Sequence, residues 1–367
     1  MSVRAQITPA GTWRGVWAGG LVAAATVIGG IVATDSVGLA LRDPDHVAAL
    51  YLGLVGLGVA LLVVLDVALR ARSRAGGRRP TRAEMAVVRR ERWTTARMAA
   101  AGLALVGFYA TYMAYRNLKA IVPLLRPGDN FDPQLADLDR SLFAGNDPAA
   151  LLHTLIGTGA VTHVLSAFYV AFIVFLPLTI GVALVFSTDV RPALFYVTAQ
   201  SINWVLGIGS YLLLPSLGPI YFEPGAFADL PGSEVTRLQG VLMQQRVDFL
   251  ADPSTGTPQS IAAFASLHLS MSFTAALAAT LLGLGRRLQV ALWVWVAITT
   301  VGTVYLGWHY FVDDIAGVLM GAVAIVLARW FTGLDLGAVR RSRQAARLEP
   351  RAWDPGAQPA GASARSH

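Results

Sequence analysis

Residues 289–331 read QVALWVWVAITTVGTVYLGWHYFVDDIAGVLMGAVAIVLARWF, and they contain two apolar runs, 289–308 and 310–331. Each run has the roughly 20 residues that an α-helix needs to cross ~30 Å of hydrocarbon. His309, Asp313 and Asp314 interrupt this apolar pattern at the junction. Ionisable groups in such segments are costly and usually functional. The stretch therefore predicts a membrane-spanning helical hairpin with a functional site near its connection.

The rest of the chain repeats this pattern. Of the 367 residues, 55% are hydrophobic and only 14% are charged, and the mean hydropathy is +0.55. These values lie far outside the range of an ordinary soluble domain. We therefore expect an all-α, polytopic membrane helical bundle of about eight transmembrane helices. The six further apolar runs lie at about 15–38, 47–69, 98–118, 163–187, 193–214 and 263–284.

The absence of cysteine excludes disulfides, thiolate metal sites and cysteine nucleophiles. The net charge of +7 is explained by arginines that flank the apolar runs, so no nucleic-acid partner is expected. Their distribution places the N-terminus in the cytoplasm, and the Arg- and Ala-rich composition suggests a multi-pass protein of a bacterial plasma membrane. The basic residues then left on the extracytoplasmic side are Arg42, Arg116, Lys119, Arg126, Arg140, Arg237 and Arg246.

Three regions are expected along the chain. Residues 1–97 would hold two extra N-terminal transmembrane helices and a basic cytoplasmic loop, 98–331 a six-helix core, and 332–367 a disordered cytoplasmic tail. Two outer loops, 125–162 and 215–262, are long enough to carry function. In the first, Leu135, Leu138, Leu142 and Phe143 recur at helical spacing, which predicts an amphipathic helix lying at the membrane surface.

The predicted topology brings three ionisable side chains to one membrane face. His268 lies at the outer start of the sixth span, and His309 and Asp313 lie at the outer start of the eighth. A spacing of four places His309 and Asp313 one helical turn apart, so the carboxylate can accept a hydrogen bond from one imidazole nitrogen and raise the basicity of the other. Such a pair prepares a nucleophile or a base. Asp314 points about 100° away and is expected to support the helix start.

Two short motifs carry a family resemblance. SLH at 266–268 and HYFVDDIAG at 309–317 resemble the last two motifs of the type 2 phosphatidic acid phosphatase superfamily, Ser-Gly-His and His-x-x-x-Asp. The leucine in SLH and the HY-x-x-D-x-x-A-G form look most like the inositolphosphotransferase branch, which includes the aureobasidin-resistance (inositol phosphorylceramide synthase) enzymes. The resemblance covers roughly 98–331 and implies a phosphatidic-acid-phosphatase-type catalytic core.

The resemblance implies a phosphohistidine mechanism without metal or cofactor. His309 would attack phosphorus, Asp313 would orient its ring, and His268 would protonate the leaving group and then activate the acceptor. Ser266 and the free N–H groups at the start of the sixth span would hold phosphoryl oxygens. The substrate would be a lipid phosphate, either a phospholipid head-group or a polyprenyl phosphate, at the outer face of the bilayer. The acceptor would be water or an alcohol such as an inositol-containing lipid, and the sequence does not distinguish them.

The cationic partners of the phosphate stay open at this point. KAIVPLLRP at 119–127 fits the superfamily's Lys-x6-Arg-Pro motif, yet two spans separate it from SLH. The family's arginine six residues before the second histidine is replaced by Thr303. A phosphoryl group in its transition state needs positive charge around its oxygens. The candidates on the expected face are Lys119, Arg126, Arg116, Arg237 and Arg246, of which Arg246 is the preferred loop residue.

Two other classes of protein remain alternatives. A membrane transporter or proton-relay protein could use the intramembrane His and Asp residues, although these groups cluster at span ends and no inverted repeat is visible. A metal site built from His268, His309 and Asp313 is also conceivable.

Overall fold

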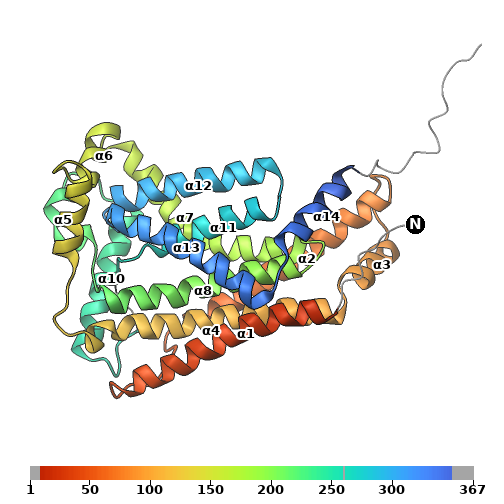
Figure 1. Cartoon of the computed structure of the whole chain (residues 1–367), viewed down its shortest axis with the longest axis horizontal. Coiled ribbons are helices and arrows are strands. Elements are labelled where there is room, and N and C mark those ends of the chain that lie inside the picture. Colours follow the sequence, from red (N-terminus) through yellow and green to blue (C-terminus); the bar gives the residue numbers. More distant parts are fainter. Residues whose placement is uncertain (1–8, 259–260, 349–367) are drawn as a thin grey trace, which may run out of the picture.

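The computed structural model describes residues 9–258 and 261–348, which form a helical bundle (Figure 1). Within these residues, six helices are long and apolar enough to cross a membrane. All eight predicted runs coincide with helices. The six are α1 (Pro9–Asp35), α2 (Val47–Arg74), α4 (Thr95–Leu125), α7 (Ala160–Phe186), α12 (Arg286–Tyr305) and α13 (Phe311–Thr332). The other two are α8 (Arg191–Leu213), which is less apolar, and α11 (Leu267–Leu281), which is shorter.

Helix α8 lies at the centre of the bundle, where it packs against α1, α4, α11 and α13. Its polar side chains are paired with α11: the Asn203 side chain donates to Thr274 Oγ1 at 2.9 Å and accepts from Ser270 Oγ at 2.7 Å, and Gln200 donates to the Met271 carbonyl at 3.1 Å. Buried polar groups must find such partners. Because α8 is surrounded by protein rather than lipid, it tolerates polar residues that lower its hydropathy.

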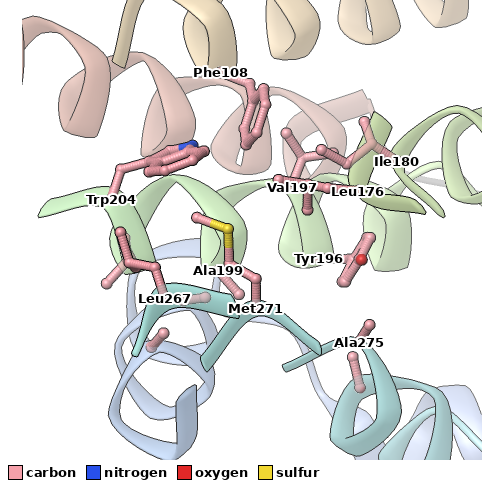
Figure 2. Close-up of a cluster of buried hydrophobic side chains, with 14 of the residues drawn as sticks. Phe108, Leu176, Ile180, Tyr196, Val197, Ala199, Trp204, Leu267, Met271 and Ala275 are labelled. Carbon is pink, nitrogen blue, oxygen red and sulfur yellow. The ribbon is translucent and has the colours of Figure 1, made fainter. Parts of the chain in front are cut away.

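Helices α11 and α13 approach each other closely because α13 carries glycines at the crossing. A Cβ atom at Gly317 would lie 2.5 Å from the Ser266 carbonyl oxygen, and one at Gly321 would lie 2.8 Å from the Ser270 carbonyl oxygen. Small residues allow this kind of backbone contact between membrane helices. On the other side of α11, Leu267 and Met271 pack into the apolar core with Trp204 and Phe108 (Figure 2). The start of α11 is thereby held beside the start of α13.

The N-terminal helices pack into the same bundle. Helix α1 lies along α4 and α8, and α2 packs against α7 and α4. The predicted boundary at residue 97 therefore divides helices that contact one another. Between α2 and α4, the basic loop contains the short helix α3 (Arg82–Arg92), whose start is capped by Thr81 and Glu84.

The shorter helices gather at the two ends of the bundle (Figure 1). One end carries α5 (Asp132–Leu142), α6 (Pro148–Ile156), α9 (Pro219–Phe222), the 3₁₀ turn η1 (Pro224–Phe227) and α10 (Glu234–Ala251). At the other end lie α3 and α14 (Leu336–Leu348). Residues 336–348 of the tail that was predicted to be disordered are helical, and 349–367 lie outside the described residues.

Helix α5 forms where the sequence predicted an amphipathic surface helix. Its buried face consists of Asp132, Leu135, Ala136 and Asp139, while Leu138 and Leu142 are about half exposed. The buried face therefore includes two acids as well as apolar residues. Two carboxylates are buried because they bind backbone N–H groups at the site described next.

Candidate active site

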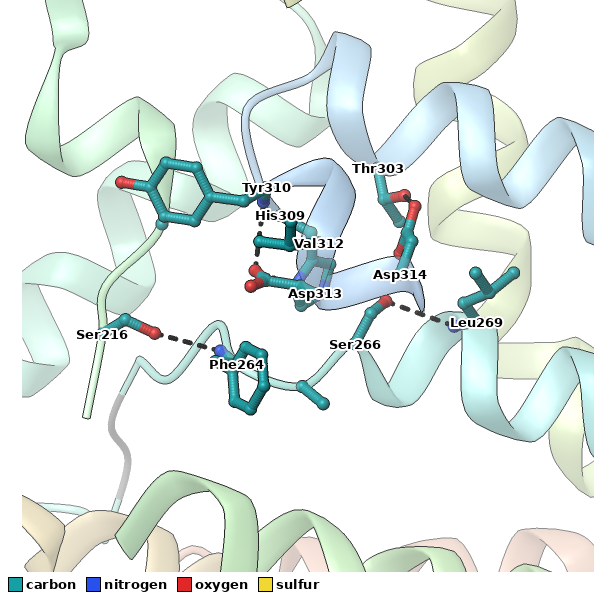
Figure 3. Close-up of polar contacts among 12 residues, drawn as sticks. Ser216, Phe264, Ser266, Leu269, Thr303, His309, Tyr310, Val312, Asp313 and Asp314 are labelled. Atoms are coloured by element: carbon teal, nitrogen blue, oxygen red, sulfur yellow. Dashed lines mark hydrogen bonds and ion pairs between the residues drawn. The ribbon is translucent and has the colours of Figure 1, made fainter. Parts of the chain in front are cut away.

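The connection between α12 and α13 carries the predicted histidine–aspartate pair. His309 Nδ1 lies 3.3 Å from Asp313 Oδ2, and the same oxygen accepts the Tyr310 N–H at 3.0 Å (Figure 3). Only 5% of His309 is exposed, and Asp313 is fully buried. The contact predicted from the spacing of four residues is thus present. It holds the imidazole in one orientation at the start of α13.

The environment of His309 favours the neutral ring. Burial lowers the pKa of His309 from 6.5 to about 3, opposed by a hydrogen bond with the Ala263 backbone and reinforced by the charge of Lys119. A neutral imidazole keeps one nitrogen lone pair at pH 7. The ring can therefore act as a nucleophile or a base without first losing a proton.

His268 lies in the first turn of α11, and its ring centroid is 5.7 Å from that of His309. The ring packs against Tyr169 and Phe172 of α7 at centroid distances of 4.5 and 4.6 Å. His268 on α11 and His309 on the α12–α13 connection therefore face one small volume, and the sequence predicted that they lie at one face of the membrane.

Ser266 joins the two motifs through its backbone and caps α11 with its side chain. Its N–H donates to the Asp313 carbonyl at 3.0 Å, and its Oγ accepts the Leu269 N–H at 3.3 Å (Figure 3). Because Ser266 is fully buried in this capping role, its predicted contact with phosphate stays a prediction. The cap does orient the N-terminus of α11, which favours anions, towards the histidines.

Asp314 faces α12, away from His309. Its Oδ2 accepts a hydrogen bond from Thr303 Oγ1 at 2.9 Å, and both residues are fully buried (Figure 3). Thr303 occupies the position where the resemblance led us to expect an arginine. The hydroxyl at that position therefore binds a neighbouring helix and supplies no positive charge to the site.

A cavity of about 340 Å³ opens beside the two histidines, and Lys119 and Arg116 of α4 also line it. Lys119 Nζ lies 5.6 Å from the ring centroid of Tyr211, and its charge acts on both histidines. Arg116 is engaged by two acids of the α1–α2 loop, Asp43 at 3.1 Å and Asp45 at 2.8 Å. Of these two cations, Lys119 is thus the better placed to meet an anion.

The other predicted cations lie farther from the pair. Arg126 and Arg246 line an adjoining cavity of about 220 Å³. Arg126 forms an ion pair with Asp129 at 2.6 Å, whereas Arg246 is half-buried where its charge also acts on Lys119. Arg237 is exposed, pairs with Glu234 and lines neither cavity. The sequence alone could not show which of these arginines is ion-paired and which lines a cavity.

Two aspartates of α5 complete the site, and the sequence analysis missed them. The Asp139 carboxylate accepts the N–H groups of Phe311 and Val312 at 2.6 and 2.9 Å. Asp132 accepts the Tyr310 hydroxyl at 3.1 Å and the N–H groups of Leu217 and Gly218. Burial raises the pKa of both acids, and these hydrogen bonds oppose the rise. The N-terminus of α13 is therefore occupied by Asp139.

A sequence signal for these acids exists. Asp132 and Asp139 are seven residues apart, with Leu135 and Ala136 between them, so all four lie on one face of a helix. Acids that share a face with apolar residues are buried only when they are hydrogen-bonded. The pattern could thus have suggested a helix that caps another element.

The family comparison agrees with this geometry. A family model described as the PAP2 superfamily matches residues 133–327. The chain belongs to the PAP2 superfamily. Members of this superfamily are generally phosphatases or phosphotransferases. Neither the curated proteins nor the solved structures yielded a match.

The PAP2 match spans both histidines, Asp313 and nearly all of α5, but it begins well after the predicted start at 98. Helices α1, α2 and α4, with Lys119 and Arg126, lie outside it. Within the described residues, no group of three His, Asp or Glu side chains is arranged to hold a metal ion.

Proposed function

We propose that this PAP2 protein is a membrane-embedded phosphatase or phosphotransferase that acts on a lipid phosphate through a phosphohistidine at His309. The observation that carries the proposal is the buried His309–Asp313 pair at 3.3 Å, at the end of a cavity that also exposes His268 and Lys119. A nucleophile, a second proton-transferring group and a cation are what phosphoryl transfer without a metal requires.

The reaction would proceed in two steps. In the first, His309 Nε2 attacks phosphorus, the bond from phosphorus to the leaving oxygen breaks, and His268 gives its proton to that oxygen. In the second, His268 takes a proton from the acceptor hydroxyl, whose oxygen attacks phosphorus and releases His309. Asp313 would hold Nδ1 and stabilise the positive ring of the intermediate. Each proton given up by His268 is recovered in the second step.

The phosphoryl oxygens would be held by Lys119 and by the first N–H groups of α11. The start of α13 is a weaker candidate, because Asp139 already accepts from Phe311 and Val312. Arg246 would add positive charge from the adjoining cavity. A helix N-terminus and a lysine together supply the charge that a phosphoryl group needs as it transfers.

The acceptor decides between the two activities. Water would make the protein a phosphatase, and an alcohol such as an inositol-containing lipid would make it a head-group transferase. The SLH and HY-x-x-D-x-x-A-G forms favour the inositolphosphotransferase branch and therefore an alcohol. The distribution of arginines favours a site on the extracytoplasmic side of a bacterial plasma membrane.

The transporter alternative has less support. The polar side chains buried between α8 and α11 are neutral amides and hydroxyls, among them Gln200, Asn203 and Thr274. Such groups do not change charge near pH 7. They therefore offer no ionisable relay through the bundle centre.

The test is to trap the intermediate and identify the products. Purified protein would be incubated with a lipid phosphate labelled with ³²P, quenched with alkali, which preserves phosphohistidine, and digested for peptide mapping. We expect label on His309 of the wild type and no label in His309→Gln. If His268 is needed to activate the acceptor, label should accumulate in His268→Gln, because the second step is then slowed. His163→Gln is the matched control, because His163 is exposed and lies outside the main cavity.

Product analysis with and without alcohol acceptors separates the two activities. Release of inorganic phosphate alone would assign the phosphatase. Undiminished turnover in both His309→Gln and His268→Gln would refute the proposal.

A further inference from the structure

The cavity beside the histidines continues as a slot lined by aromatic and apolar side chains. Phe108 and Tyr112 of α4, Phe172 and Leu176 of α7 and Trp204 of α8 form its walls. The Trp204 ring packs against Tyr112 at a centroid distance of 5.3 Å. No charged side chain lines this part, since Lys119 and Arg116 lie towards one end of the α4 wall. The cavity thus has a charged end and an apolar end.

The slot reaches far into the bundle. Lys119 and Phe108 both line it and are eleven residues apart on α4, which corresponds to about 16 Å along the helix axis. This is about half the thickness of a ~30 Å hydrocarbon core. A cavity of about 340 Å³ lies near the lower limit of small-molecule pockets. Its length and small volume suit one extended chain rather than two.

Helix α2 closes one side of the slot with Tyr51 and Val55. It is anchored near both ends, because Arg116 binds the loop before it and Asp66 binds Arg92 at 2.5 Å. Between Ala48 and Asp66, a stretch that the structure describes in full, no residue of α2 is buried. The middle of this wall therefore packs against the core only through partly buried residues, among them Val55 and Val59.

Beside α2, the wall of the slot includes a residue with a large exposed surface. Ile173 of α7 lines the cavity, yet 51% of its surface is exposed. Helix α2 packs against α7 and α4 but buries few of its own residues. Ile173 thus marks where we expect a hydrophobic molecule in the membrane to have access to the cavity, between α2 and α7.

We propose that the slot binds one apolar chain of the phosphorylated substrate, which enters laterally between α2 and α7, and that α2 determines which chains fit. The inference rests on the proposed function and adds a role for a helix outside the PAP2 match. The phosphate would lie at the end with Lys119, His268 and His309, and the chain would lie against Tyr112, Trp204 and Val55. The charged end of the cavity thus matches the phosphate, and the apolar end matches the hydrocarbon chain.

The test uses hexyl, decyl and tetradecyl phosphate as substrates. For the wild type, kcat/KM should rise with chain length, because each methylene that enters the slot leaves water. Val55→Trp places bulk inside the slot and should lower kcat/KM for tetradecyl phosphate by about 10-fold or more. Turnover of hexyl phosphate, which leaves the deep part of the slot empty, should fall much less than turnover of tetradecyl phosphate, and the thermal midpoint of the purified variant serves as the folding control.

Leu54→Trp is the matched control, since Leu54 is the neighbour of Val55 on α2, is 55% exposed and does not line the cavity. It should leave the whole chain-length series unchanged. An equal effect of Val55→Trp on all three substrates, or no effect, overturns the inference and leaves the histidine chemistry standing. If Leu54→Trp changes kcat/KM along the chain-length series as much as Val55→Trp does, the inference is also overturned.

A second measurement does not depend on turnover. Decyl phosphate with a diazirine at its chain end should label the wild type near Phe108 or Trp204, and Val55→Trp should abolish this labelling. Labelling confined to exposed helix faces, or labelling unchanged by Val55→Trp, overturns the inference. If no alkyl phosphate is turned over but the slot is labelled, the proposed chemistry fails while the chain site stands.

Discussion

Asp139 should act as a positioning residue for His309. It does not line the cavity, but its carboxylate binds the N–H groups of Phe311 at 2.6 Å and Val312 at 2.9 Å, directly after the histidine segment. In Asp139→Asn, one side-chain oxygen remains an acceptor and the other is replaced by an NH₂ group. One buried N–H of α13 then faces a donor instead of an acceptor.

The size of the effect follows from these contacts. A buried donor left without an acceptor costs about 1–3 kcal/mol, and loss of a helix N-cap costs about 1 kcal/mol. We therefore expect the free energy of unfolding to fall by about 2 kcal/mol. Since His309 precedes Phe311 by two residues, a shift at the start of α13 moves the ring. A misplacement of about 1 Å can lower a rate by about 100-fold.

The assay compares turnover of decyl phosphate with the thermal midpoint of the purified protein in detergent. Asp139→Asn should lower kcat by about 10-fold to 100-fold and leave KM nearly unchanged, because Lys119 and α11 do not depend on Asp139. Asp137→Asn is the control, since Asp137 lies on the same helix with a 79% exposed side chain. A lower thermal midpoint with wild-type kcat, or a raised KM at unchanged kcat, would refute the positioning role.

Three further predictions concern the protonation of His309, the charge of Lys119 and the orientation of the chain in the membrane. Because the pKa of His309 falls from 6.5 to about 3, the unfolded chain binds one more proton between these values, and the free energy of unfolding decreases by about 1.4 kcal/mol per pH unit on acidification. His309→Gln should therefore show a flatter fall of the thermal midpoint between about pH 6.5 and 4.5; parallel curves would contradict this. Lys119→Met should lower kcat/KM for decyl phosphate by about 100-fold. Lys119→Arg should recover part of this loss because it keeps the positive charge, and a role of the apolar part of the Lys119 side chain would not explain that recovery. Because the chain lacks cysteine, Ser254→Cys should react with an impermeant maleimide on intact cells and Ser73→Cys only after permeabilisation; the reverse pattern would invert the proposed orientation.

Much of the fold could be predicted because membrane helices have a local signal. Hydropathy over about 20 residues is a property of one segment, so all eight runs were found. Hydropathy indicated less well how the helices are arranged. Helix α8 is not among the six helices that are apolar enough to cross a membrane, because it is enclosed by protein and carries polar residues, and α1 packs against α4 and α8 although the sequence placed it in a separate region.

Part of the candidate site could likewise be predicted from the sequence, and part could not. His309 and Asp313 are four residues apart, so the sequence placed them close together, although His309 lies two residues before α13 and not within it. The cations were different, because Arg116 and Lys119 lie within one turn of α4 and look equivalent in the sequence. Only the fold of the α1–α2 loop brings Asp43 and Asp45 to Arg116, whereas Lys119 lines the cavity beside the histidines.

The sequence by itself therefore determined the class of protein, the eight apolar helices and the pair at the α12–α13 junction, since each depends on residues close together in the chain. The tertiary structure alone decided that Asp139 binds the start of α13, across 172 residues of sequence. It also decided that α2 closes the apolar slot beside His268. Such contacts are made by side chains from distant segments, and no local periodicity records which segments will meet.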